Sequence, residues 1–261
     1  MLIDTHCHLA HGKLFGRVAD LLEEARQAGV GHVICAAGDL HESKTALGLT
    51  AKYGTVHSMA GIHPHEARHA DENALSQVAD LAGKDKVVAI GEIGLDYHYD
   101  FSPVEDQKHA FIRQLQLARQ LHCPVVIHTR EAFEDTLAIL DESGMDWTRV
   151  LMHSFTGEPE QTRRLLDRGA MISYSGIATF NSAREIRQSV EMTPTDRILV
   201  ETDAPFLSPE PVRKIHPNVP AHVVHTARRV ANILGIDEEQ LAAETTANAI
   251  RFFSLPIEQE A

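Results

Sequence analysis

Eight short runs of apolar and β-branched residues recur along the chain, and segments with helical spacing separate them. The runs are nearly continuous in apolar residues, which is typical of strands that are buried on both faces of a parallel sheet. We therefore expect strands at 2–4, 33–37, 56–61, 87–91, 124–128, 150–153, 171–175 and 198–202.

The connecting segments show the period of amphipathic helices. Apolar residues in 18–25 recur at i, i+3, i+4 and i+7, and Gly29 follows where a helix would end. A longer stretch, 104–121, places an apolar stripe on one face before Pro124, which cannot continue a helix. Helices are therefore expected between the strands.

Alternating strands and helices predict parallel strands joined by right-handed crossovers, and eight such units close into a barrel. The chain of 261 residues falls within the size range of one barrel. We predict an α/β fold, a single (β/α)8 TIM-like barrel domain over 1–261, with an open doubly wound sheet as the alternative. The Pro-rich stretch 205–220 predicts a long ordered loop, and 223–253 predicts closing helices.

Composition adds limits to this fold. The net charge of −13 argues against broad neutralisation of nucleic-acid phosphates, although it permits phosphate contacts inside a metal site. The N-terminus does not resemble a secretory signal, and no apolar run is long enough to span a bilayer. Three widely separated cysteines favour free thiols. We expect a cytoplasmic protein with no membrane association and no obligate protein partner.

Histidines and carboxylates follow the predicted strands at their C-terminal ends, the rim where parallel barrels build their sites. They are His6 and His8 after the first strand, His63 after the third, Glu92 after the fourth, His128 and His153 at the ends of the fifth and sixth, and Asp203 after the eighth. Each alone has an ordinary structural explanation, such as a helix cap or a buried histidine. Their joint occurrence at one rim predicts a metal centre.

Side-chain alternation refines this set. His6 and His8 are separated by one residue, so on an extended segment both rings point to the same side and Cys7 points away. The same alternation places Glu201 and Asp203 on one side, which makes Glu201 a rival for the role of Asp203.

The donor types restrict the metal. Imidazole favours zinc, iron, manganese or cobalt over magnesium, while the carboxylates keep harder ions possible. Six ligands exceed the need of one tetrahedral zinc, and two cations about 3.5–4 Å apart would accommodate them. We expect one or two divalent cations per chain, with zinc, manganese or magnesium as candidates.

Six segments carry a resemblance to a known family; they read IDTHCHL, GIHPHEA, AIGEIGLDY, PVVIHTREA, LMHSFTG and LVETDAPFL. In order and approximate spacing they resemble the TatD family of metal-dependent deoxyribonucleases, within the amidohydrolase-type barrels. The resemblance implies hydrolysis of phosphodiester bonds, notably 3′ to 5′ trimming of single-stranded DNA, so that nucleic acid would be the substrate.

The resemblance also implies roles for individual residues. His6, His8, Glu92 and Asp203 would hold one ion, and Glu92, His128 and His153 would hold the other, with Glu92 bridging. Asp203 would take the proton from the attacking water, which makes Asp203 and Glu92 the catalytic candidates. His63 and Arg130 match positions near the substrate.

The loop after the last strand departs from the family, because this chain reads VRKIHPNVPAHV where the family often carries a Gly-Lys-Arg-Asn-Glu-Pro stretch. Residues of the same type as in the family stretch remain at Arg213, Lys214, Asn218 and Pro220. The acidic residue of the family stretch is replaced by Val219. Substrate choice is the property that this change affects.

Two other functions remain open from the sequence. Related barrels use the same metal chemistry on small amides, lactones and esters, so a small-molecule hydrolase is the alternative. A non-catalytic metal-binding scaffold is the third reading.

Overall fold

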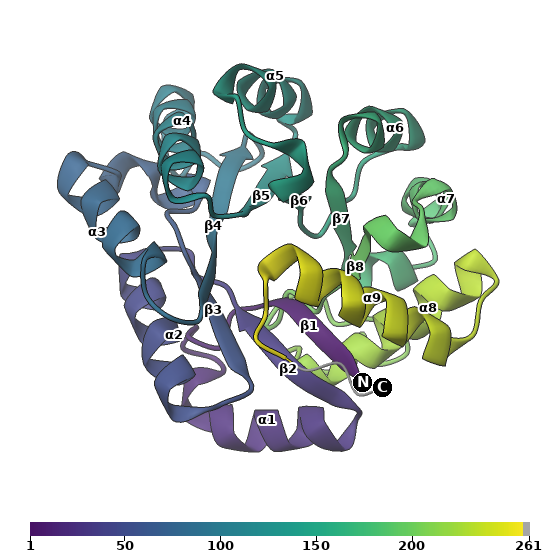
Figure 1. Ribbon diagram of the computed structural model, residues 1–261. Helices are drawn as coiled ribbons and strands as arrows, with labels where there is room; N and C mark the ends of the chain where they lie inside the picture. The colour runs from purple at the N-terminus through teal and green to yellow at the C-terminus, as the bar shows by residue number, and fades with distance from the viewer. Residues whose placement is uncertain (258–261) are drawn as a thin grey trace. The chain divides into compact units, whose positions relative to one another are not determined.

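The computed structural model describes residues 1–257. Eight strands alternate with helices along the chain, and every strand pair that is described is parallel (Figure 1). This arrangement confirms the predicted (β/α)8 fold class. The chain divides into two compact units, which we call the terminal unit (Met1–Cys35 and His153–Ala261) and the central unit (Ala36–Met152).

The terminal unit contains four strands and five α-helices among the described residues. Its elements are β1 (Leu2–Cys7), α1 (Val18–Gln27), β2 (Val30–Cys35), α6 (Pro159–Arg168), β7 (Met171–Tyr174), α7 (Arg184–Met192), β8 (Ile198–Val200), α8 (Val223–Leu234) and α9 (Glu238–Phe253), with short 3-10 turns η1 (Phe15–Arg17), η4 (Gly176–Thr179), η5 (Thr195–Arg197) and η6 (Pro220–His222). Strand β1 pairs with β2, and β7 pairs with β8. Helix α9 packs on β1 and β8 (Figure 1).

The central unit contains the other four strands, paired in chain order from β3 to β6. Its elements are α2 (Leu40–Lys52), β3 (Val56–Ala60), η2 (Pro64–His69), α3 (Glu72–Ala82), β4 (Val87–Asp96), α4 (Val104–Leu121), β5 (Val125–Arg130), α5 (Phe133–Ser143), η3 (Trp147–Arg149) and β6 (Val150–Met152). Helix α4 has the bounds that the sequence predicts, and it packs against β4.

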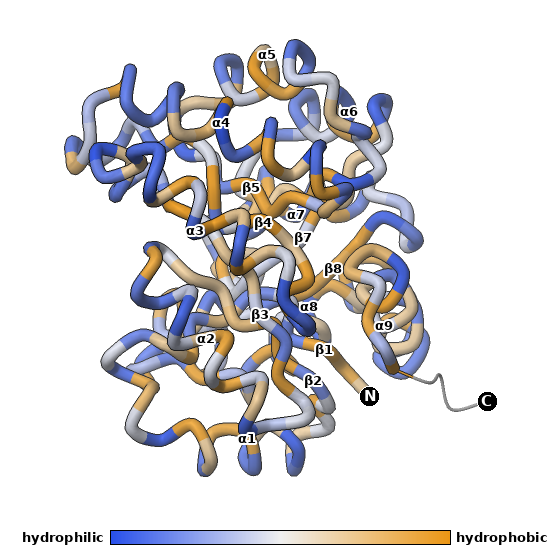
Figure 2. Tube along the Cα trace, turned by 60° about the vertical axis from the view of Figure 1, so that its left-hand side comes forward, coloured by the Kyte–Doolittle hydropathy of each residue, from blue (hydrophilic) through white to orange (hydrophobic). Residues whose placement is uncertain are grey.

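Burial follows the predicted pattern in both units. All residues of β1, β3, β6, β7 and β8 are buried, as expected for strands covered on both faces. Figure 2 shows strands such as β5 and β8 in the hydrophobic colour, while the helices alternate between hydrophobic and hydrophilic stretches. None of the helices within residues 1–257 combines the length and the hydrophobicity that a membrane span requires.

The predicted end of the fourth strand is wrong, and the correction bears on Glu92. Strand β4 continues to Asp96, so Glu92 lies inside the strand and not after it. Gly94 makes the continuation possible: its φ is +141°, and a Cβ there would lie 2.0 Å from the carbonyl oxygen of His128 on β5. His6 and His128 likewise lie within β1 and β5, because polar residues end an apolar run before the backbone pairing ends.

Candidate metal centre

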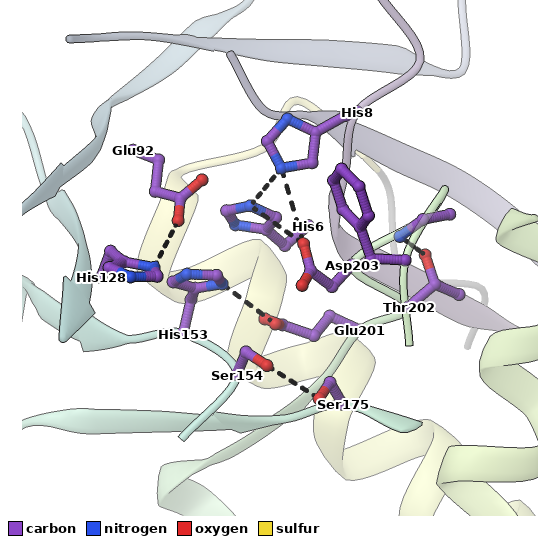
Figure 3. A network of polar contacts seen from close by, with 12 residues as sticks. His6, His8, Glu92, His128, His153, Ser154, Ser175, Glu201, Thr202 and Asp203 are labelled. Carbon is purple, nitrogen blue, oxygen red and sulfur yellow. Dashed lines mark hydrogen bonds and ion pairs between the residues drawn. The ribbon is translucent and has the colours of Figure 1, made fainter. Parts of the chain in front are cut away.

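Two histidines at the end of β1 meet a carboxylate that follows β8. The Nε2 atoms of His6 and His8 lie 3.3 Å apart, so both rings point to the same side as the alternation predicts. Asp203 Oδ1 lies 3.5 Å from His8 Nε2 and 3.9 Å from His6 Nε2 (Figure 3). One ligand atom from each of the three residues falls within 4.8 Å of the others, a spacing that a single cation could occupy.

The backbone explains why residues nearly 200 positions apart meet. Asp203 N–H donates to the carbonyl of His6 at 2.9 Å, and His8 N–H donates to the carbonyl of Ala204 at 2.7 Å. Asp203 adopts a φ of 55°, in the left-handed region that Asp tolerates better than most residues. The parallel pairing between β1 and the segment after β8 thus continues past the strand ends. This pairing places His6 and His8 next to Asp203.

Glu201, the rival for the role of Asp203, faces a different partner. Its Oε1 lies 3.2 Å from His153 Nδ1, and the ring of His153 stacks on His6 with centroids 4.0 Å apart (Figure 3). Glu201 is fully buried, and its Oε2 has no hydrogen-bond partner within residues 1–257. A buried carboxylate is costly unless a cation or hydrogen bonds compensate it. His6, His153 and Glu201 form a second group with metal-ligand spacing.

The electrostatics of these residues, which we call the terminal cluster, favour an ionised Asp203. Burial alone would raise the pKa of Asp203, but the hydrogen bond from His8 and the nearby rings of His6 and His153 outweigh it and hold this pKa below its ordinary value. The terminal cluster comprises His6, His8, His153, Glu201 and Asp203.

Asp4, which the strand-end argument did not select, holds the strand end that precedes Asp203. Its Oδ1 accepts from the backbone N–H of Thr202 at 2.9 Å, and its Oδ2 is 2.6 Å from the Thr202 hydroxyl. Burial raises the pKa of Asp4 to about 8. Because Thr202 immediately precedes Asp203, Asp4 orients the backbone that presents the candidate base.

The central unit holds a second donor group, the central cluster of His63, Glu92 and His128. Glu92 Oε1 lies 2.9 Å from His128 Nδ1 and 3.3 Å from His63 Nε2. Figure 3 shows the Glu92 carboxylate directed at the His128 ring. Burial lowers the pKa of His63 to about 4, against the opposing pull of the Glu92 charge. His63 therefore presents a neutral ring at neutral pH, the form that binds metals.

Asp96 and His65 also contact this cluster, and the strand-end argument missed both. Asp96 Oδ2 accepts from His128 Nε2 and from His65 Nε2, each at 3.0 Å. Burial would raise the pKa of Asp96, but these hydrogen bonds hold it well below its ordinary value. Alternation along β4 offers the signal that could have identified it, because Glu92 and Asp96 are four residues apart and share one side of the strand.

The donors fit a cation on chemical grounds. His128 faces a carboxylate at each ring nitrogen, yet a neutral imidazole carries only one N–H. With Nε2 donating to Asp96, Nδ1 presents its lone pair to the oxygen of Glu92, an arrangement that a cation between the two atoms would satisfy. Imidazole and carboxylate together suit zinc and manganese, and the donor set does not select between them.

Three further residues were candidates for substrate contact. His63, predicted to meet substrate, lies among the donors of the central cluster. Arg130 is the last residue of β5, and its guanidinium carbon sits 4.9 Å from the centre of the Tyr99 ring. Arg213 stacks on Phe180 at 3.9 Å. The ligand and substrate roles of all these residues stay predictions.

The fold and the two clusters define a metal-dependent hydrolase of the (β/α)8 class. Over residues 3–254 the chain matches the family described as TatD related DNase, and it belongs to that family. It is 36% identical over 255 residues to an uncharacterized metal-dependent hydrolase, YabD, of Bacillus subtilis, covering 98% of this chain and 100% of the relative.

Two further relatives support the same placement. A 3′-5′ ssDNA/RNA exonuclease TatD of Cronobacter sakazakii is 37% identical over 238 residues, which is 90% of each chain. The crystal structure of YJJV, a TatD homologue of Escherichia coli, superposes with a TM-score of 0.91 at 28% identity and covers 98% of both chains.

Proposed function

We propose that this hydrolase cleaves phosphodiester bonds of single-stranded nucleic acid and removes nucleotides from the 3′ end of single-stranded DNA. The observation that carries the proposal is the terminal cluster, in which the carboxylate of Asp203 lies 3.5 Å from His8 Nε2 and 3.9 Å from His6 Nε2. A relative that is 37% identical over 90% of its length bears the name 3′-5′ ssDNA/RNA exonuclease, which supports this choice of substrate.

The residues present fit divalent cations in each unit. His6, His8 and Asp203 would hold a cation in the terminal unit, and Glu92 with His128 would hold one in the central unit. Bound divalent cations supply Lewis-acid polarisation of the phosphate and stabilise the charge that develops on its oxygens. The bridging role of Glu92 and the ligand role of His153 stay predictions.

The chain's own carboxylate provides the proton transfer. Asp203 accepts a proton from the water that attacks phosphorus, and the bond between phosphorus and the leaving nucleoside oxygen breaks. A base must be ionised before the reaction, and the histidines around Asp203 favour that state. Asp96 accepts a hydrogen bond from His128 Nε2–H and thereby orients the His128 ring, so that His128 Nδ1 stays directed at Glu92.

Hydrolysis of end-labelled DNA tests the proposal. Purified protein reconstituted with manganese or zinc is incubated with a 5′-fluorescent single strand, and parallel samples receive EDTA or a strand with a blocked 3′ end. We expect a ladder that shortens from the 3′ end, abolished by EDTA and by the blocked end. Turnover of a chromogenic lactone or amide without any DNA ladder would contradict the proposal and favour a small-molecule hydrolase.

A further inference from the structure

Two aromatic rings lie exposed in the loop that leaves β4. The Tyr99 and Phe101 residues are 42% and 53% exposed, and their rings stack with centroids 5.3 Å apart and planes inclined by 28°. Large aromatic side chains usually bury most of their surface, and this pair leaves about half of its surface exposed, which a flat ligand could cover. We call Tyr99 and Phe101 the aromatic platform.

The platform adjoins the central cluster. The His65 ring meets Phe101 at 4.7 Å and Tyr99 at 5.4 Å, and it lies 4.3 Å from the His63 ring. His63 in turn contacts Glu92 at 3.3 Å. Two ring contacts and the His63–Glu92 contact therefore connect the platform to a carboxylate of the candidate metal centre.

The loop that carries the platform is anchored from below. The Ser102 hydroxyl donates to the carbonyl of His65 at 2.8 Å and accepts from the backbone N–H of Arg68 at 3.2 Å. The Gln107 side chain donates to the carbonyl of Ser102 at 3.0 Å. Ser102 is itself buried, so the rings project from a fixed base, and little ordering entropy is lost when a flat ligand stacks on them.

A cation lies beside the rings. The Arg130 guanidinium sits over Tyr99 at 4.9 Å and is exposed, and within residues 1–257 it forms no ion pair with a carboxylate. Exposed aromatic rings next to an unpaired arginine match the two parts of a nucleotide, a flat base and an anionic phosphate.

We infer that Tyr99 and Phe101 stack on a base near the 3′ end of the strand and that Arg130 contacts an adjoining phosphate. The inference rests on the proposed function, because it names the part of the same substrate that the chain recognises. Stacking is tolerant of base identity, since every base has an aromatic face. The platform thus gives single strands, whose bases are free, an advantage over duplexes.

The test compares two DNA strands of equal length and charge. One carries normal bases, and in the other the last two 3′ nucleotides are abasic tetrahydrofuran residues. KM for 3′ trimming by metal-loaded protein is measured together with binding by fluorescence anisotropy, for which the 3′-terminal linkages of both strands are phosphorothioates that resist cleavage. The variants are Tyr99→Ala, Phe101→Ala and the conservative Tyr99→Phe. Tyr53→Ala is the matched control, because a cation also lies over the Tyr53 ring, here Lys52, but Tyr53 precedes β3 and so lies at the N-terminal end of a strand.

We expect wild-type protein to bind the normal strand about 5- to 100-fold more tightly than the abasic one, the range of one stacked base. Tyr99→Ala and Phe101→Ala should lose most of this preference at unchanged metal content, whereas Tyr99→Phe and Tyr53→Ala keep it. If the alanine variants trim DNA and retain the wild-type preference, the platform is wrong and the proposed function stands. If metal-loaded wild-type protein trims neither strand, the proposed function is wrong, and so is the inference that the platform binds a base of its substrate.

Discussion

The side chain of Asn218 ties the long loop after β8 to the strand end that precedes Asp203. Its Nδ2 donates to the carbonyls of Thr202 at 3.0 Å and Phe206 at 2.7 Å. Its Oδ1 accepts from the backbone N–H of Val219 at 3.0 Å and from His222 Nδ1 at 2.8 Å. Asn218 is fully buried and uses both donors and both acceptor positions of its amide.

Asn218→Ala should destabilise the fold because it removes both amide donors. Each hydrogen bond contributes about 1 kcal/mol net, and the buried carbonyl of Thr202 would be left without this donor at a cost of about 1–3 kcal/mol. We expect a loss of roughly 2–4 kcal/mol, which lowers Tm by roughly 5–12 °C in a chain of this size. Asn218→Asp should cost at least as much, since it directs an oxygen at the two carbonyls.

Urea and thermal unfolding followed by circular dichroism measure the effect. Asn73→Ala, at an exposed position of α3, is the control and should stay within about 0.5 kcal/mol of wild type. Metal binding by the terminal cluster should weaken in Asn218→Ala as well, because Thr202 precedes Asp203. An Asn218→Ala variant with wild-type Tm would refute the role assigned to this amide.

Three further changes test other parts of the structure. Gly94→Ala should unfold at a much lower temperature than wild type, because its Cβ would lie 2.0 Å from a backbone carbonyl of β5; Gly54→Ala, which meets nothing within 4 Å, is the control, and equal Tm values would contradict the close approach. Asp203→Asn should lower kcat by about 100-fold or more with the fold intact. Wild-type kcat in that variant at full metal loading would transfer the role of base to Glu201. Burial lowers the pKa of His222 below 6.5, so the unfolded state binds more protons and stability should fall as pH drops through about 6.5; urea titrations of His222→Gln should show a weaker fall, and identical pH profiles would exclude this effect.

The hydrophobic pattern predicted the strands and helices well, because burial leaves a characteristic spacing of apolar residues in each element. Helix α4, for example, begins and ends at the predicted residues. The end of β4 could not be predicted in the same way, because the apolar run stops at Gly91 while the backbone pairing continues. Gly94, which lets β4 approach β5 closely, looks like a loop residue in the sequence.

The candidate site was predictable as a set of residue types and not as contacts. The strand-end rule selected His6, Glu92 and Asp203 from local pattern alone. The rule did not select Asp96 and His65, because their role in the site depends on a hydrogen bond between residues 31 positions apart in the sequence. The sequence pattern also could not predict that Glu201 and Asp203 contact different residues. The left-handed φ of Asp203 breaks the side-chain alternation that was assumed for the strand end.

Metal content is the most direct test of the central claim that these clusters bind divalent cations. Wild-type protein, His6→Ala/His8→Ala and the control His41→Ala/His109→Ala, which removes two exposed histidines on α2 and α4, are purified alike and analysed by inductively coupled plasma mass spectrometry. We predict at least one transition-metal ion per chain in the wild type and the control, and a clear loss in His6→Ala/His8→Ala. Unchanged metal content in His6→Ala/His8→Ala would contradict the assignment.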